Sequence, residues 1–475
     1  MNIKALVPWL GAILLSGPVT AFAQLAPADI FTDHMVLQRE KPITVWGTAP
    51  AGGEVSVSLG KERASAKADG TGHWQVELPA LPASGPFELA ITSAGESKSF
   101  TDIMLGDVWV ISGQSNVVLA LQATTKWAEA KTEGVFPTIR ICKLPGTHAF
   151  QPVEVSSRPP RWEILNSAKA GYFSGVGYYF ARTVQPAIGV TLGLVQASAG
   201  GTQAEQWTPE ADLRAALPDN PLLADREKAM AQAAANPAAK IGATMAGAAV
   251  MYNGTVHPLR HLKLAGVLWY QGEANTRSKR DYAPVLKTLV TSWRGVFDQP
   301  DLPWIIVQLP NFGLPKDDGW MRVRESQRLI AKELGLPLVI TIDQGSATTI
   351  HPPNKDEVGR RTALAALQSV YKQDVEGTAP QFKSAQAAQG GVVVDFDGFK
   401  GDLVQKGDAL PGFELAGADG AFHPAEARVQ GRSVLVKSAE VSAPKEVRYL
   451  WATSPEVVAL YSASGLPAGP FRSGL

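Results

Sequence analysis

The chain has 475 residues, more than one compact hydrophobic core usually holds, so two or three domains are expected. Hydrophobic residues make up 45% and charged residues 19%, which excludes both a disordered chain and a membrane-embedded one. The 44 Lys and Arg balance the 44 Asp and Glu, so no net field favours nucleic acid or an anionic surface. A neutral ligand is compatible with this balance.

The N-terminus has the pattern of a cleavable signal peptide. Lys4 precedes a mostly apolar run over residues 5–15, and Ala21 and Ala23 occupy the small-residue positions ahead of Gln24. The apolar run is too short to span a bilayer, so no membrane insertion is expected. Residues 1–23 are therefore predicted to be removed and the mature protein to be periplasmic or secreted.

Two regions of the chain read as β-structure. Residues 24–101 alternate short apolar and polar runs punctuated by Gly and Pro, which is typical of a β-sandwich-like domain. Similar runs return over residues 373–475, which are predicted as a C-terminal β-rich region. This second region either forms a small β-sandwich of its own or adds strands that complete the N-terminal β-sandwich.

Residues 102–372 change to strands separated by longer helical segments. Apolar segments rich in Val, Ile and Leu are predicted as parallel strands over 108–112, 191–197, 265–270, 304–309 and 338–343. Amphipathic segments are predicted as helices over 174–184, 282–296, 322–334 and 356–371. This alternation predicts an α/β domain with a doubly wound parallel sheet, whose ligands bind beyond the carboxyl ends of the strands.

Ser115 follows the first of these strands, in the run Gly113-Gln-Ser115-Asn-Val. A strand, a glycine turn and a helix start expose a hydroxyl at the sheet edge, where amide N–H groups can hold a developing oxyanion. The run lacks the second glycine of the α/β-hydrolase elbow. A lone serine here is otherwise a turn residue or a helix cap, so the choice depends on other motifs.

Three further motifs follow later strands, at the same edge of the predicted sheet. The second strand is followed by Gly200-Gly-Thr, whose glycines let the backbone approach a ligand closely. The third runs into Gln271-Gly-Glu-Ala-Asn, and the last is followed by His351-Pro-Pro-Asn-Lys-Asp-Glu-Val-Gly-Arg-Arg. With the Ser115 run, four motifs therefore gather where ligands bind.

These motifs resemble the SGNH/GDSL hydrolases and, within them, the sialate O-acetylesterases and related carbohydrate acetylesterases. That family reads Gly-Gln-Ser-Asn-Met, Gly-Gly-Thr, Trp-Tyr-Gln-Gly-Glu-Ser-Asn and His-Pro-x-Asn-Lys-x-x-Val-Gly-Arg-Arg, and here Val117 and Ala274 replace its Met and Ser. Residues 31–38 and 465–472 also resemble the family, so the resemblance spans nearly the whole chain. It implies an SGNH-type (flavodoxin-like) α/β core between the two β-regions.

The resemblance implies a serine esterase mechanism. Ser115 would be the nucleophile, and His351 the general base that takes its proton and returns it to the leaving alcohol. The oxyanion would be held by the amides of Ser115 and of Gly200 or Gly201, and by the side chain of Asn275.

The group that orients His351 is less clearly marked. The wider superfamily often has an aspartate three residues before the histidine, where this chain has Thr348. Asp343, at the end of the last strand, is therefore the candidate catalytic acid, with a backbone carbonyl as the alternative. The predicted substrate-pocket residues are Gln114, Asn116, Trp207, Gln271 and Glu273.

The implied activity is removal of O-acetyl groups from carbohydrates, with an O-acetylated carbohydrate as the partner and no cofactor. His257 and His261 could share one helical face, but no third ligand of suitable spacing accompanies them, so no metal site is predicted.

The sequence leaves the acetylated sugar open. The family implies sialates, whose carboxylate could pair with Arg277, Arg322 or Arg324, while plant polysaccharides such as xyloglucan or xylan are the alternative. From other classes, the chain could be a non-catalytic carbohydrate-binding protein. It could also be a glycosidase, which would need two facing carboxylates such as Glu205 and Glu273.

Overall fold

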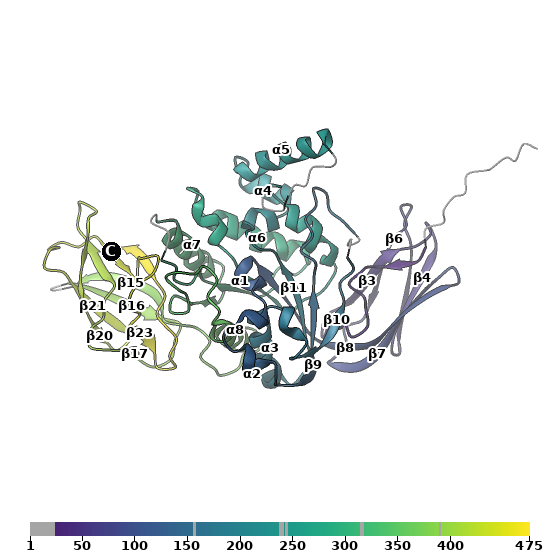
Figure 1. Cartoon of the computed structure of the whole chain (residues 1–475), viewed down its shortest axis with the longest axis horizontal. Coiled ribbons are helices and arrows are strands. Elements are labelled where there is room, and N and C mark those ends of the chain that lie inside the picture. The colour runs from purple at the N-terminus through teal and green to yellow at the C-terminus, as the bar shows by residue number, and fades with distance from the viewer. Residues whose placement is uncertain (1–23, 155–157, 237–241, 243–245, 314–317, 389–390) are drawn as a thin grey trace, which may run out of the picture.

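The computed structural model arranges the chain as three regions in a row, with β-rich regions at both ends and an α/β region between them (Figure 1). The structure describes residues 24–154, 158–236, 242, 246–313, 318–388 and 391–475. The predicted signal peptide, residues 1–23, lies outside the described residues. Within the described ranges, every helix is too short or too polar to cross a membrane.

The central sheet has six neighbouring parallel strands and one antiparallel edge strand. These strands are β8 (Glu96–Gly113), β9 (Val135–Lys143), β10 (Trp162–Asn166), β11 (Leu192–Ser198), β12 (Gly266–Tyr270), β13 (Trp304–Val307) and β14 (Leu338–Val339). Their order is β10-β9-β11-β8-β12-β13-β14, with β10 antiparallel to β9. All five predicted strands are present, although β14 is shorter than the predicted 338–343. β9 and β10 are not among the strands predicted for this sheet, although the end of β9 around Cys142 reads as a buried strand, and Cys142 is indeed buried there.

Helices cover both faces of this sheet. The α-helices of the described residues are α1 (Ser115–Val118), α2 (Trp127–Ala130), α3 (Gly175–Ile188), α4 (Glu210–Ala216), α5 (Pro221–Ala235), α6 (Ala283–Val296), α7 (Gly319–Glu333) and α8 (Lys355–Ser369). α3 and α8 pack together over the face that carries Trp109 and Ile111. α6 and α7 cover the face that carries Val110 and Trp269. Both faces are therefore buried, as the predicted α/β sheet requires.

Single turns of tighter or wider helix complete the helical structure. They are η1 (Leu121–Ala123), η2 (Ala170–Tyr172), η3 (Ala204–Trp207), η5 (Tyr252–Val256), η6 (His257–Leu259) and η7 (Glu273–Arg277). Two of them, η3 and η7, follow β11 and β12 and lie beyond the carboxyl ends of these strands.

The N-terminal region is built from β-strands, which are antiparallel apart from β2, the parallel neighbour of β8. Its strands are β1 (Ala26–Pro27), β2 (Val36–Gln38), β3 (Ile43–Thr48), β4 (Glu54–Leu59), β5 (Glu62–Lys67), β6 (His73–Leu78) and β7 (Ser84–Ser93). One sheet has the order β1-β3-β6, while β4, β5 and β7 join β8. β8 is 18 residues long, and its first half pairs with β2 and β7 while its second half pairs with β11 and β12. The predicted division between residues 101 and 102 therefore falls inside one strand.

The C-terminal region is also β-rich, as predicted. Its strands are β15 (Gln381–Ala388), β16 (Gly391–Asp397), β17 (Leu403–Gln405), β18 (Phe413–Ala416), β19 (Phe422–Pro424), β20 (Glu426–Gln430), β21 (Ser433–Lys437), β22 (Glu446–Tyr449), β23 (Leu460–Ser462) and β24 (Phe471–Gly474). They form the sheets β15-β16-β21-β20, β19-β18-β22-β24 and β17-β23. Phe382 of β15 stacks on Phe471 of β24 and so joins two of these sheets, while Phe413 stacks on its cross-strand partner Tyr449 within one sheet.

A buried arginine joins this region to the α/β region. The Arg324 guanidinium donates to the carbonyl oxygens of Leu309 (2.9 Å) and Pro310 (2.6 Å), which follow β13. It also donates to those of Ala452 (2.7 Å) and Thr453 (3.0 Å), which follow β22. One side chain thus donates hydrogen bonds to four backbone carbonyls from two regions. These bonds hold the two regions together.

Candidate active site

Ser115 is the first residue of α1, directly beyond the end of β8. Gly113 makes the turn before it, with φ of +136°, and a Cβ on Gly113 would lie 2.1 Å from the carbonyl oxygen of Tyr270. No other residue type fits there. The Ser115 side chain is half-buried, and the strand, glycine turn and helix start place it at the carboxyl edge of the sheet.

The loop after β11 brings two exposed glycines beside Ser115. A Cβ on Gly200 would lie 3.8 Å from Ser115 Cβ, and the Ala199 N–H donates to the Gly113 carbonyl (3.2 Å). Gly201 has φ of +72°, a conformation that disfavours side chains. Among the described residues, the hydrogen bonds include none from the backbone N–H of Ser115, Gly200 or Gly201. These three N–H groups are therefore candidate donors to an oxygen atom of a ligand.

Buried amide side chains connect the loops after β8, β11 and β12 by hydrogen bonds and fix their positions relative to one another. Gln114 Oε1 accepts from Gln271 Nε2 (3.1 Å) and from the Ala274 N–H (3.0 Å). Gln271 Nε2 also contacts the Thr202 carbonyl oxygen (3.1 Å). Gln271 and Gln114 have almost no solvent exposure, so these bonds form in a low-dielectric interior where their geometry is well defined.

The same network orients Asn275, which lies in η7. Its Oδ1 accepts from Gln271 Nε2 (2.7 Å) and from the Ala204 N–H (3.2 Å), while its Nδ2 donates to Glu205 Oε2 (2.9 Å). These contacts distinguish the amide oxygen from the amide nitrogen and prevent a flip. An amide nitrogen has two N–H bonds, so one remains after the contact with Glu205.

His351 lies in the loop between β14 and α8, and its side chain is exposed. The loop is tied to the Ser115 loop because Asn116 Nδ2 donates to the carbonyl oxygen of Ile350 (3.1 Å). Partial burial and the positive charge of Lys355 lower the pKa of His351, which favours the unprotonated imidazole that a general base requires. The described hydrogen bonds include none from Ser115 Oγ to the His351 ring, a contact that in esterases tightens on substrate binding.

Asp343 is half-buried and paired with Arg361. Its two carboxylate oxygens accept from Arg361 Nη1 (2.6 Å) and Nη2 (2.7 Å), and Arg361 also pairs with Glu357 (2.7 Å). The described hydrogen bonds of Asp343 reach Arg361 and do not include one to His351. An orienting role of Asp343 toward His351 therefore stays a prediction.

The comparisons with known proteins agree with this geometry. The family model for carbohydrate esterases, sialic acid-specific acetylesterase, matches residues 105–366, more than half of the chain. This chain belongs to that family. The sialate O-acetylesterase of Rattus norvegicus is 27% identical over 94% of this chain and 94% of its own length. That of Homo sapiens is 26% identical over 94% of this chain and 91% of its own length.

A solved structure extends the comparison to the whole fold. The carbohydrate acetylesterase from Xanthomonas citri is 34% identical, with a TM-score of 0.83 over 94% of this chain and 99% of that one. The family membership and these relatives identify the chain as a carboxylic ester hydrolase, and specifically as a sialate O-acetylesterase-like carbohydrate acetylesterase. The mixed α/β fold with additional β-sheets is the fold of that carbohydrate esterase.

The side chains predicted for the substrate pocket of this esterase are all buried, namely Gln114, Asn116, Trp207, Gln271 and Glu273. Trp207 packs edge-on against Trp269, with ring centroids 6.2 Å apart, and its Nε1 donates to Thr202 Oγ1 (2.9 Å). These residues form the support behind the Ser115 loop, and a direct contact of any of them with substrate stays a prediction.

Of the three arginines considered for a sugar carboxylate, two are engaged elsewhere. Arg324 binds the four backbone carbonyls described above, and Arg322 pairs with Asp318 (2.9 Å). Arg277 is exposed at the end of η7, and the ion pairs of the described residues include none to it. Arg277 is therefore the arginine of this set that is free to meet an acidic sugar.

The esterase site also contains a buried cation that the sequence pattern did not identify. Lys355, the first residue of α8, is fully buried, and its Nζ donates to Asn116 Oδ1 (2.7 Å). A lysine at a helix start is expected in solvent, because the helix dipole and burial both disfavour a cation there. The only sequence signal for its burial was its place in the His351 motif.

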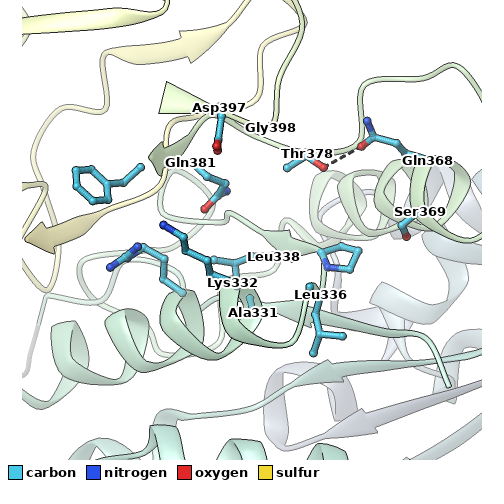
Figure 2. A pocket seen from close by; sticks show the side chains of 14 residues that line it. Ala331, Lys332, Leu336, Leu338, Gln368, Ser369, Thr378, Gln381, Asp397 and Gly398 are labelled. Atoms are coloured by element: carbon cyan, nitrogen blue, oxygen red, sulfur yellow. Dashed lines mark hydrogen bonds between the residues drawn. The ribbon is translucent and has the colours of Figure 1, made fainter. Parts of the chain in front are cut away.

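A separate cavity of about 380 Å³ lies between the ends of α7 and α8 and the C-terminal β-region (Figure 2). Leu336 and Leu338 line one side of it, and Gln381 and Asp397 line another. Leu338 begins β14, whereas the loop with His351 follows the other end of that strand. The cavity is thus at the opposite edge of the sheet from Ser115.

Proposed function

We propose that this chain is an exported O-acetylesterase of carbohydrates that works through an acetyl-serine intermediate. The observation that carries the proposal is that Gly200 lies beside Ser115 and that buried amide contacts tie the loop of Asn275 to the loop of Ser115, so that fixed N–H donors lie at one edge of the sheet. Such preorganised donors are the usual source of transition-state stabilisation in acyl transfer.

In the proposed reaction, His351 removes the proton of the Ser115 hydroxyl as Oγ attacks the acetyl carbonyl carbon. The carbonyl oxygen becomes an oxyanion and accepts hydrogen bonds from the Ser115 N–H, the N–H of Gly201 or Gly200, and Asn275. The bond to the sugar oxygen then breaks, and His351 returns the proton to that oxygen. A water molecule deprotonated by His351 attacks the acetyl-serine and releases acetate.

We further propose that the core is of the SGNH, flavodoxin-like type. With the outer strand β9 set aside, the strands β11-β8-β12-β13-β14 follow the order 2-1-3-4-5 in their own chain sequence, which is the order of flavodoxin-like sheets. The order reverses at β8, and ligands bind at such reversal points beyond the carboxyl ends. Ser115 follows β8, which supports both the fold type and the site.

The orientation of His351 is proposed to come from Asp343 or from a backbone carbonyl. Both Asp343 oxygens bind Arg361, which supports the backbone carbonyl.

Glycoside hydrolysis is disfavoured by the state of its two candidate carboxylates. Glu205 and Glu273 are buried, and each accepts a hydrogen bond from an asparagine, Asn275 and Asn116 respectively. Two carboxylates that act on a glycosidic bond must instead face the sugar.

The experiment that tests the function is acetate release from a substrate panel. The panel holds O-acetylated sialic acid, acetylated xylo-oligosaccharide and acetylated xyloglucan fragments, with wild type beside Ser115→Ala. We expect release by wild type and none above background by the variant, and the ranking of substrates identifies the sugar. Folded wild type that releases acetate from none of them, yet binds one, would instead favour a carbohydrate-binding protein.

Export is a separate proposal, supported by the pattern of residues 1–23. Expression of the full chain in a Gram-negative host should yield periplasmic or secreted protein that begins near Gln24. N-terminal sequencing of the purified protein tests this, and cytosolic protein that retains Met1 would contradict it.

A further inference from the structure

Lys355 occupies a position that is unfavourable for a cation in two ways. It begins α8, where the helix dipole is positive, and its side chain is fully buried. Burial lowers the pKa of Lys355 to about 7, and the negative charge of Glu273 opposes this effect. The salt bridges of the described residues include none that involves Lys355. A group placed at such a cost to stability is a candidate for a role in function.

The Lys355 ammonium is directed at a single amide. Nζ donates to Asn116 Oδ1 (2.7 Å) and lies 5.5 Å from the ring centre of Tyr270. A Cβ on Gly175 would lie 3.5 Å from Lys355 Cβ, so α3 packs closely against the lysine stem. The ammonium group is thus confined by β12, α3 and the Ser115 loop.

Asn116 is fully buried and every polar atom of its side chain is engaged. Its Oδ1 accepts from Lys355, and its Nδ2 donates to Glu273 Oε1 (2.5 Å) and to the carbonyl oxygen of Ile350 (3.1 Å). Asn116 directly follows Ser115, and Ile350 directly precedes His351. One amide therefore links the two loops within one residue of each reacting group.

The charges around this amide also act on His351. The positive charge of Lys355 contributes to the lowered pKa of His351, while partial burial is the larger cause. Glu273 of η7 is the carboxylate that opposes Lys355, and burial raises the pKa of Glu273. Tyr270 of β12 stays neutral, because burial raises the pKa of its hydroxyl. On α8 itself, Glu357 is neutralised by Arg360 and Arg361.

We propose that Lys355 is a positioning residue of this esterase, which fixes Asn116 and thereby the distance between Ser115 and His351, and whose positive charge adds to the preference of His351 for its unprotonated form. This inference rests on the proposed roles of Ser115 and His351. Lys355 touches neither reacting group, so it acts through Asn116 and through its electrostatic field.

The test compares wild type, Lys355→Met and Asn116→Ala on 4-nitrophenyl acetate, with kcat and KM measured across pH. General-base catalysis contributes about 10²–10⁴-fold, so misplacing the base should lower kcat at least about tenfold in both variants with little change in KM. In Lys355→Met the acid limb of the profile should move to higher pH, because the imidazole loses a neighbouring cation. In Asn116→Ala, which keeps the lysine, the acid limb should stay near its wild-type position.

The matched control is Lys263→Met, which removes another sheltered lysine, one that donates to Asp298 (3.0 Å) away from Ser115. Its kcat and pH profile should equal those of wild type, whatever its melting temperature. Folded Lys355→Met with wild-type kcat and acid limb would overturn the inference and leave the lysine a purely structural role. If Lys355→Met does not fold, Asn116→Ala decides, since wild-type kcat in that variant would overturn the positioning role.

A second readout separates this inference from the proposed function. The rate at which a fluorophosphonate probe labels Ser115 reports activation of the nucleophile without any sugar. If wild-type Ser115 is not labelled, the proposed function fails, and with it the basis of the inference. If wild type is labelled and Lys355→Met is labelled equally fast at each pH, only the role of Lys355 fails.

Discussion

Replacement of Asn275 by alanine tests the oxyanion hole most directly. In the proposed mechanism the remaining Asn275 N–H binds the oxyanion, and loss of one such donor costs about 10²–10³-fold in kcat, or about 3–4 kcal/mol of transition-state stabilisation. KM should change little, because the donor acts mainly on the transition state. The assay is steady-state hydrolysis of 4-nitrophenyl acetate, followed by acetate release from the best sugar substrate.

The structure also determines how much stability the variant loses. Gln271 keeps its contacts with Gln114 and Thr202, and Glu205 keeps a contact with Asn220 (3.4 Å), whereas the buried Ala204 N–H loses its partner. One unsatisfied buried donor costs about 1–3 kcal/mol, which urea unfolding measures. The protein should therefore remain folded in the kinetic assay.

Asn220→Ala is the matched control for this experiment. Asn220 binds the same Glu205 carboxylate and caps α5 through the Leu222 N–H (3.0 Å), but it belongs to α5 and not to the loops around Ser115. Loss of a cap costs about 1 kcal/mol, so the stability effects of the two variants are comparable. If Asn275→Ala retains as much kcat as Asn220→Ala, the oxyanion role of Asn275 is refuted.

Three further predictions concern pH, the catalytic acid and the junction of the regions. Only unprotonated His351 accepts the serine proton, and the pKa of His351 is lowered. The value of kcat/KM should therefore stay high down to a pH below the ordinary histidine range, and a fall centred at or above about pH 6.5 would contradict this. Asp343→Asn should lower the unfolding free energy by about 3 kcal/mol, because both carboxylate oxygens bind buried Arg361. The kcat of this variant should fall far less than the roughly 10⁴-fold loss expected for the acid of a catalytic triad. Urea unfolding and steady-state kinetics measure the two effects, and a loss near 10⁴-fold would make Asp343 the orienting group. Arg324→Met should lower the unfolding free energy by at least about 2 kcal/mol, because the carbonyl oxygens of Leu309 and Ala452 lose their donor. Those of Pro310 and Thr453 keep the Trp320 Nε1 and Phe312 N–H donors. A change under about 1 kcal/mol would show that water replaces the guanidinium.

Most of the central fold follows from local sequence pattern. Four long amphipathic helices and five apolar strands are visible because burial on one or both faces leaves a clear periodicity. β9 was not assigned to the sheet, since Pro137 and Arg140 interrupt its apolar run. Arg140 is buried, and its charge is paired with Asp102 (3.0 Å). A partner so far away in the chain cannot be recognised from the local sequence.

The candidate site also has a part that the sequence predicts and a part that it does not. Ser115, Gly200 and Asn275 could be placed together because each follows a parallel strand of one sheet, and such ends share an edge. The contacts of Asp343 and Lys355 could not be predicted in this way. Whether Asp343 faces His351 or Arg361, and whether Lys355 faces solvent or Asn116, depends on how α8 docks on the sheet. Sequence periodicity does not specify that docking.

The continuity of β8 has a mechanical consequence. A single strand whose hydrogen-bond ladder runs from the N-terminal sheet into the catalytic sheet leaves no linker at which the two could bend. Opening a hinge there would require breaking ladder bonds on both edges of the strand. The N-terminal β-region is therefore a rigid extension of the catalytic sheet, held at the end of β8 opposite to Ser115.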